Sequence, residues 1–94
     1  MITIVAKKMI KLGKTGEFKL LAEELINESR KEIGCISYSL FEDSNNSNIL
    51  TFIEEWESIE AIKLHNNSKH FITIVPMLAQ FQEGETEINL YKKI

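Results

Sequence analysis

The sequence of 94 residues has little of several things that define other protein classes. A single cysteine, Cys35, cannot form an internal disulfide, so the fold does not depend on an oxidising compartment. No apolar run approaches the ~20 residues that a membrane-spanning helix needs. The charges near the start follow the apolar stretch, which is the reverse of a secretory signal. We therefore expect a cytoplasmic protein with no membrane segment.

Basic residues are not in excess, with eleven against fourteen acidic ones and a formal charge of −3. This balance argues against nucleic acid as a partner. The hydrophobic share of 44% and the charged share of 27% are typical of globular proteins, and we expect one domain over residues 1–94. A domain this short buries little more than ~60% of the surface that its unfolded chain exposes. Oligomerisation is a common way to supplement so small a core.

Hydrophobic periodicity divides the first half of the chain into a strand, a helix and a hairpin. The β-branched segment 2–10 alternates as a strand. An apolar stripe at helical spacing begins at Phe18 and predicts a helix that Gly34 would end. Alternation returns in 35–42 and 49–57, and the Asn- and Ser-rich residues between them predict a turn.

The second half of the chain predicts helices followed by a last strand. Ser58 is placed to cap a short helix that ends near His65, a further helix begins near Lys69, and segment 85–93 alternates as a strand. The order β-α-β-β-α-β is that of the ferredoxin-like, split βαβ fold of the α+β class. We expect a four-stranded antiparallel sheet with its helices on one face.

The predicted strands are apolar on both faces, although helices can cover only one of them. In the third strand, Leu50, Phe52 and Trp56 point to one side, whereas Ile49 and Ile53 point to the other. A large exposed apolar face is unusual for a monomer. We therefore predict a homodimer joined through its sheet faces.

Three sequence patterns in the middle of the chain resemble one known family. Residues 34–38 read Gly-Cys-x-x-Tyr, residues 54–58 read Glu-x-Trp-Glu-Ser, and two histidines five residues apart, His65 and His70, precede the aromatic Phe71. Together with the element order, these patterns resemble the antibiotic biosynthesis monooxygenase family. The resemblance implies a dimeric α+β barrel with a pocket between sheet and helices in each subunit.

The resemblance also implies a range of activities. Relatives include cofactor-free oxygenases of quinols or polyketide phenols, enzymes that process the autoinducer-2 signal, and haem-degrading enzymes. Three positions depart from the haem-degrading pattern, because Val75 stands where those relatives have a ligating histidine, Lys8 where they have asparagine, and His65 where they have tryptophan. Haem is therefore not expected.

His65 and His70 are the only histidines and the candidate catalytic bases, because imidazole takes up a proton near neutral pH. In the family, histidines at these positions lie at or near the pocket. Each could instead serve a structural role, such as capping a helix. Tyr38 is a third candidate, since its hydroxyl could donate to a carbonyl or a phenolate. No metal site is expected, because the chain offers no third histidine and no zinc motif.

A second group of residues is predicted to bind the substrate. An indole ring beside a carboxylate suits an aromatic or quinoid compound, and a lysine on an apolar strand face could hold an anion. The structural alternatives are core packing for the aromatic residues and an edge position for the lysine. The predicted binding residues are Trp56, Phe52, Glu54, Phe71, Leu78 and Lys8.

The glycines do not form a phosphate-binding loop, so no nucleotide cofactor is expected. We interpret the chain as a cofactor-free monooxygenase that acts on a quinol or another enolisable compound with dioxygen, with a histidine as general base. Two alternatives remain open at this point: a proton-transfer isomerase of the autoinducer-2-processing type, and a dimer that binds a small molecule without catalysis.

Overall fold

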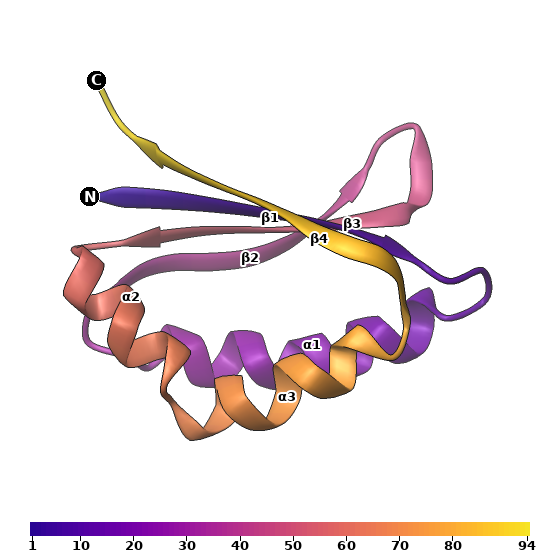
Figure 1. Cartoon of the computed structure of the whole chain (residues 1–94), viewed down its shortest axis with the longest axis horizontal. Helices are drawn as coiled ribbons and strands as arrows, with labels where there is room; N and C mark the ends of the chain where they lie inside the picture. Colours follow the sequence, from indigo (N-terminus) through magenta and orange to yellow (C-terminus); the bar gives the residue numbers. More distant parts are fainter.

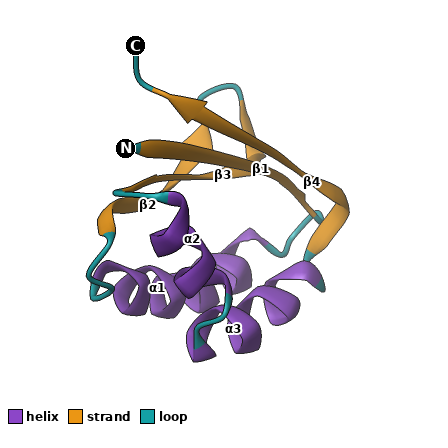
Figure 2. Cartoon of the chain, turned by 60° about the vertical axis from the view of Figure 1, so that its left-hand side comes forward, coloured by secondary structure: helices purple, strands orange, loops and turns teal.

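A computed structural model describes all 94 residues and has two layers, a four-stranded sheet and three helices on one of its faces (Figures 1 and 2). The strand order is β2-β3-β1-β4, and every neighbouring pair is antiparallel. This arrangement confirms the predicted ferredoxin-like fold. The elements in chain order are β1 (Ile2–Ile10), α1 (Thr15–Arg30), β2 (Cys35–Asp43), β3 (Asn46–Trp56), α2 (Ile59–Asn66), α3 (Lys69–Ala79) and β4 (Gln82–Lys92).

The central strand β1 alternates as its sequence predicts, with its even-numbered residues turned toward the helices. Ile4, Ala6 and Ile10 are buried there, and so is Lys8. The pairing of β1 with β4 shifts register between Lys7 and Met9, where Gly84 of β4 has a positive φ of 71°. This bulge places extra residues of β4 opposite Lys8, at the edge of the helix-facing side.

Helix α1 ends at Arg30, four residues before the glycine that the sequence analysis took as its stop. The amides of Lys31 and Glu32 bond to carbonyls three residues back, which tightens the chain into turns instead of continuing the helix. The Arg30 Nε atom donates to the carbonyl of Tyr38 at 2.9 Å and ties the helix end to β2. As a consequence, Glu32 lies in the connecting turn. Gly34 has a packing role, because a methyl group there would collide with the side chain of Ala61.

The hairpin between β2 and β3 is tighter than predicted. Asp43 pairs with Asn46, so the turn consists of residues 44 and 45 instead of residues 43–48. The Asp43 carboxylate accepts from the Asn45 amide at 3.0 Å, a local contact that favours the turn. Strand β4 also begins earlier than predicted, at Gln82.

Two serines set the junction between α2 and α3. The Ser58 hydroxyl accepts from the Ala61 amide at 3.1 Å and caps α2, as predicted. The Ser68 hydroxyl accepts from the Phe71 amide at 3.3 Å, which caps α3, and donates to the carbonyl of His65 at 2.6 Å. These contacts hold the end of α2 against the start of α3, where both histidines lie.

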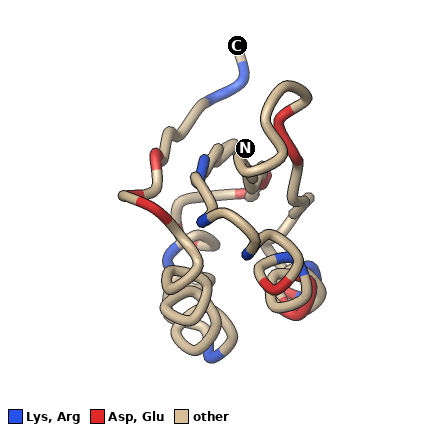
Figure 3. The backbone as a smooth tube through the Cα atoms, turned by 90° about the vertical axis from the view of Figure 1, so that its right-hand side faces the viewer, with Lys and Arg blue, Asp and Glu red and all other residues tan.

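Charged residues of both signs occur in both layers, and neither sign gathers on one side (Figure 3). None of the three helices is long and apolar enough to cross a membrane. The cytoplasmic location stays a prediction.

Candidate active site

A cavity of about 270 Å³ lies between the helix-facing side of the sheet and the helices α2 and α3. Most of the residues that line it are apolar. The polar ones include one residue of β1, one of β3 and two from the last turn of α2. Seven of the nine residues that the sequence analysis proposed for the site line this cavity. They are Lys8, Tyr38, Phe52, Glu54, His65, Phe71 and Leu78. Trp56 and His70 lie outside its lining.

His65 is enclosed by aromatic rings and is only 1% exposed. Its ring centroid lies 4.5 Å from that of Trp56, 5.0 Å from Phe71 and 5.4 Å from Tyr38. This packing fixes the imidazole between the sheet and the helical layer. Its Nε2 atom is buried and has no hydrogen-bond partner. A buried nitrogen without a partner is costly unless it serves a purpose, so this atom is a candidate for direct chemistry.

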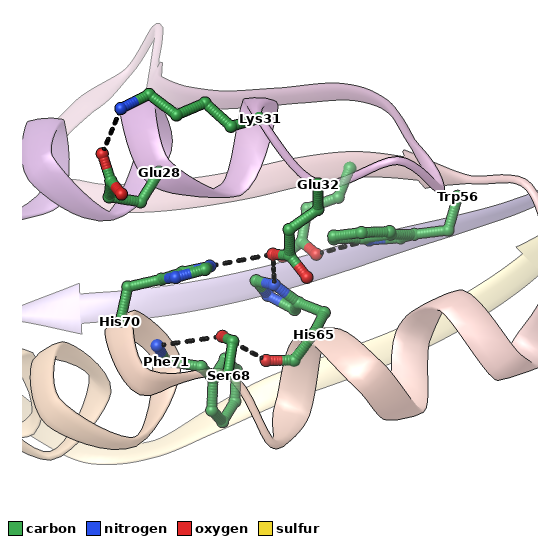
Figure 4. A network of polar contacts seen from close by, with 9 residues as sticks. Glu28, Lys31, Glu32, Trp56, His65, Ser68, His70 and Phe71 are labelled. Atoms are coloured by element: carbon green, nitrogen blue, oxygen red, sulfur yellow. Dashed lines mark hydrogen bonds and ion pairs between the residues drawn. The ribbon is translucent and has the colours of Figure 1, made fainter.

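The other nitrogen of His65 is held by Glu32, a residue that the sequence analysis did not assign to the site. One oxygen of Glu32, Oε2, lies 2.6 Å from His65 Nδ1 and 2.9 Å from His70 Nε2 (Figure 4). A carboxylate can only accept hydrogen bonds, so we assign a proton to each of these two nitrogens. The assignment leaves the Nε2 atom of His65 as an unprotonated lone pair.

The electrostatics of His65 favour the neutral ring. Burial lowers its pKa below the usual value for histidine, because a charged imidazole would lose its hydration. The hydrogen bond to Glu32 and the charge of Glu32 act in the opposite direction and offset part of this shift. The net shift is downward, so the neutral ring is favoured, and the Glu32 carboxylate lies where it would stabilise an imidazolium.

Glu32, His65 and His70 are also the only set of side chains that could ligate a metal ion, since their ligand atoms lie within 4.8 Å of one another. Both nitrogens already donate to the same oxygen, so the three groups are satisfied without an ion. Three protein ligands would leave an open coordination position, as in catalytic metal sites. The prediction that the chain holds no metal stays a prediction.

Glu54 is the buried carboxyl group of the cavity, and it is 6% exposed. The Trp56 indole donates to its Oε1 atom at 2.9 Å, so Trp56 orients the carboxyl group from behind the cavity wall. Burial raises the pKa of Glu54 to about 7, although the Trp56 hydrogen bond and the charge of Lys8 oppose the shift. Near neutral pH this group is therefore poised between its acid and its carboxylate.

Burial also keeps Tyr38, which lines the cavity, and Cys35, which does not, in their protonated forms. Burial raises the pKa of Tyr38, which is 2% exposed, so its hydroxyl remains a donor. Burial also raises the pKa of the Cys35 thiol to about 11, and a thiol of this kind is a poor nucleophile.

These features define a small α+β protein with an apolar pocket and a buried histidine held by a carboxylate. A family model described as antibiotic biosynthesis monooxygenase matches residues 1–76, and the chain belongs to this family. The resemblance in the central patterns is thereby confirmed, and the family supports a monooxygenase-like function in general terms.

Three relatives show the extent of the similarity. The chain is 37% identical to YcnE of Bacillus subtilis, a candidate monooxygenase, over 76% of its own length and 75% of that protein. It is 33% identical to the uncharacterised protein sll1783 of Synechocystis over 97% of its own length, and it spans only 62% of that protein. A crystal structure of a conserved protein from Methanosarcina mazei Go1 is 42% identical and superposes with a TM-score of 0.97, covering 99% of this chain and 92% of the other.

Proposed function

We propose that the protein is a cofactor-independent monooxygenase that oxidises a small quinol or another enolisable compound, with His65 as its general base. The observation that carries the proposal is the buried Nε2 atom of His65, which has no partner although the residue lines an apolar cavity. Membership of the family supports the reaction class. The hydrogen bond from Nδ1 to Glu32 supports the choice of His65 over His70, whose ring lies outside the cavity lining.

In the proposed first step, the substrate's hydroxyl proton moves to Nε2 of His65. The imidazolium that forms is paired with the Glu32 carboxylate, and an opposite charge at 2.6 Å stabilises it. The substrate is left as a phenolate or enolate, which is richer in electrons than the neutral compound. We assign Glu32, and His70 behind it, as positioning residues that keep the proton of His65 on Nδ1.

In the proposed second step, the substrate anion supplies electrons to dioxygen and a carbon–oxygen bond forms. One oxygen atom stays on that carbon as a carbonyl, and the other leaves as water, with both of its hydrogens drawn from the substrate. The substrate is the only reductant in this balance, so the reaction needs no cofactor. The protonated Tyr38 hydroxyl would donate to the substrate anion, and the apolar walls would keep water from the intermediate.

One observation favours a second candidate, a proton-transfer isomerase. The cavity holds two titratable groups whose ordinary pKa order is inverted, since burial raises the pKa of Glu54 to about 7 and lowers that of His65 below its usual value. Such a pair could take a proton from one atom of a substrate and return it to another. An isomerase of this kind would consume no oxygen.

We also propose that the protein works as a homodimer joined through the outer sheet face. Val5, Ile49 and Ile53 are only half-buried there, and Phe41 and Tyr91 are 51% and 54% exposed. Their apolar area supports a partner of the same kind. Sedimentation at micromolar concentration should give twice the monomer mass of 10.8 kDa, and a clean monomer would contradict this proposal.

Oxygen uptake with a panel of benzene and naphthalene quinols tests the proposed function. We expect one oxygen molecule consumed for each substrate molecule, without release of hydrogen peroxide, at a rate well above that of the protein-free solution. Loss of substrate without oxygen uptake would instead identify the isomerase. No turnover of any compound, despite measurable binding in the cavity, would favour a binding protein and contradict the proposal.

A further inference from the structure

Lys8 is a buried cation without a counter-ion. It is 9% exposed and lines the cavity, and no carboxylate lies within 4.0 Å of its Nζ atom. Buried charges in proteins are normally paired, because an unpaired one loses its hydration without compensation. Burial accordingly lowers the pKa of Lys8, and the nearby Glu54 offsets only part of that effect.

The fold directs this ammonium group instead of letting it reach solvent. Its Nζ atom donates to the Thr86 hydroxyl at 2.8 Å and to the side-chain amide oxygen Oε1 of Gln82 at 3.5 Å. Both partners come from the bulged start of β4, on either side of Gly84. An ammonium group has three donors, and both oxygens that hold Lys8 are neutral. At least one donor is therefore free for a ligand, and the positive charge is not neutralised.

The groups that line the cavity come from different elements of the fold. Lys8 and Thr86 belong to β1 and β4, whereas His65 belongs to α2, and apolar side chains such as Phe52 and Leu78 occupy the wall. The volume of about 270 Å³ equals that of about nine water molecules in the liquid, which suits one or two fused rings. A ligand that satisfies both groups carries an anion for Lys8 and an acidic hydroxyl for His65.

We propose that Lys8 forms a carboxylate subsite and that the substrates are hydroxylated aromatic acids. The carboxylate of the substrate would pair with the ammonium group of Lys8, and its hydroxyl would lie at His65. The role of His65 in this inference rests on the proposed function. The carboxylate subsite at Lys8 concerns only binding and can be tested without turnover. The pairing would also supply the counter-ion that Lys8 lacks.

Calorimetric titration with two matched probes tests the subsite without any turnover. The probes are 6-hydroxy-2-naphthoate and 2-naphthol, which differ by the carboxylate. The wild-type protein should bind the acid at least ten times more tightly than the naphthol. Lys8→Met should weaken binding of the acid by about 10- to 100-fold, the range for a hydrogen bond to a charged group, and change binding of the naphthol by less than threefold. Lys63→Met, at an exposed position of α2, is the matched control and should change neither.

Equal losses for both probes, or no loss for the acid, would overturn the subsite. Lys8→Met should fold, because replacing a buried charge by an apolar side chain of similar length is often neutral or stabilising. Lys8→Gln, which keeps a polar group but no charge, should repeat the selective loss of the acid. If Lys8→Met selectively weakens binding of the acid but no hydroxylated aromatic acid causes oxygen uptake, the proposed function fails and the subsite stands. If oxygen is consumed without any preference for acids, the subsite fails alone.

Discussion

Replacing His65 by glutamine should lower kcat for oxygen uptake by about 10²- to 10⁴-fold, the usual contribution of a general base. Glutamine approximates the size of the ring and keeps a polar atom near Glu32, but it cannot take up the substrate proton. The loss should fall on kcat more than on KM, since the walls that bind the substrate remain. Oxygen-electrode rates on an active quinol give the measurement.

His70→Gln is the matched control for this experiment. His70 donates to the same oxygen of Glu32 but lies outside the cavity lining, so its loss should reduce kcat by less than tenfold. Full turnover by the His65→Gln variant would contradict the assignment of the base. A larger loss in the His70 variant than in the His65 variant would show that the two roles had been exchanged.

Glu54→Gln should make the protein more stable than the wild type at alkaline pH and leave its stability little changed at acidic pH. The pKa of Glu54 is about 7 in the folded protein against 4.5 as the ordinary value. Between these two values the folded chain keeps a proton that the unfolded chain loses, so the wild type loses stability as pH rises through this window. The shift corresponds to about 3 kcal/mol. Glutamine removes this dependence and still accepts from the Trp56 indole.

Urea denaturation of both proteins from pH 4.5 to 8 measures the effect. Other carboxyl groups titrate in the same range, but they contribute equally to both proteins, and the difference isolates Glu54. The groups that face Glu54 are Trp56, Lys8, Tyr38 and, at longer range, Glu32. A difference in unfolding free energy that does not change with pH would contradict the raised pKa.

Local patterns predicted the elements of the fold, because each pattern has one physical cause. Alternation in 2–10 reflects a strand with one face against the helices, and the stripe from Phe18 reflects the buried side of α1. Boundaries were less predictable, since they depend on contacts between elements. The end of α1 is one example, where Arg30 bonds to the backbone of β2 and a tight turn follows.

That same boundary explains why Glu32 escaped the sequence analysis. A helix that continued to Gly34 would carry Glu32 on one of its faces, whereas the observed turn directs it to two histidines that are 33 and 38 residues away in sequence. No local pattern encodes that contact, which requires α1, α2 and α3 to be packed. Lys8, in contrast, gave a local signal as the one charged residue on an apolar strand face. Its lack of a counter-ion, however, becomes visible only in the folded chain.

We infer that His65 holds its proton on Nδ1 and uses its unprotonated Nε2 atom as the base. Nitrogen NMR of protein labelled in its histidine rings measures this directly. At pH 7 we expect a protonated Nδ1 with a strongly deshielded proton in the bond to Glu32, an Nε2 without a proton, and loss of this deshielded signal in Glu32→Gln. A ring protonated on Nε2 alone, or on both nitrogens at that pH, would contradict it.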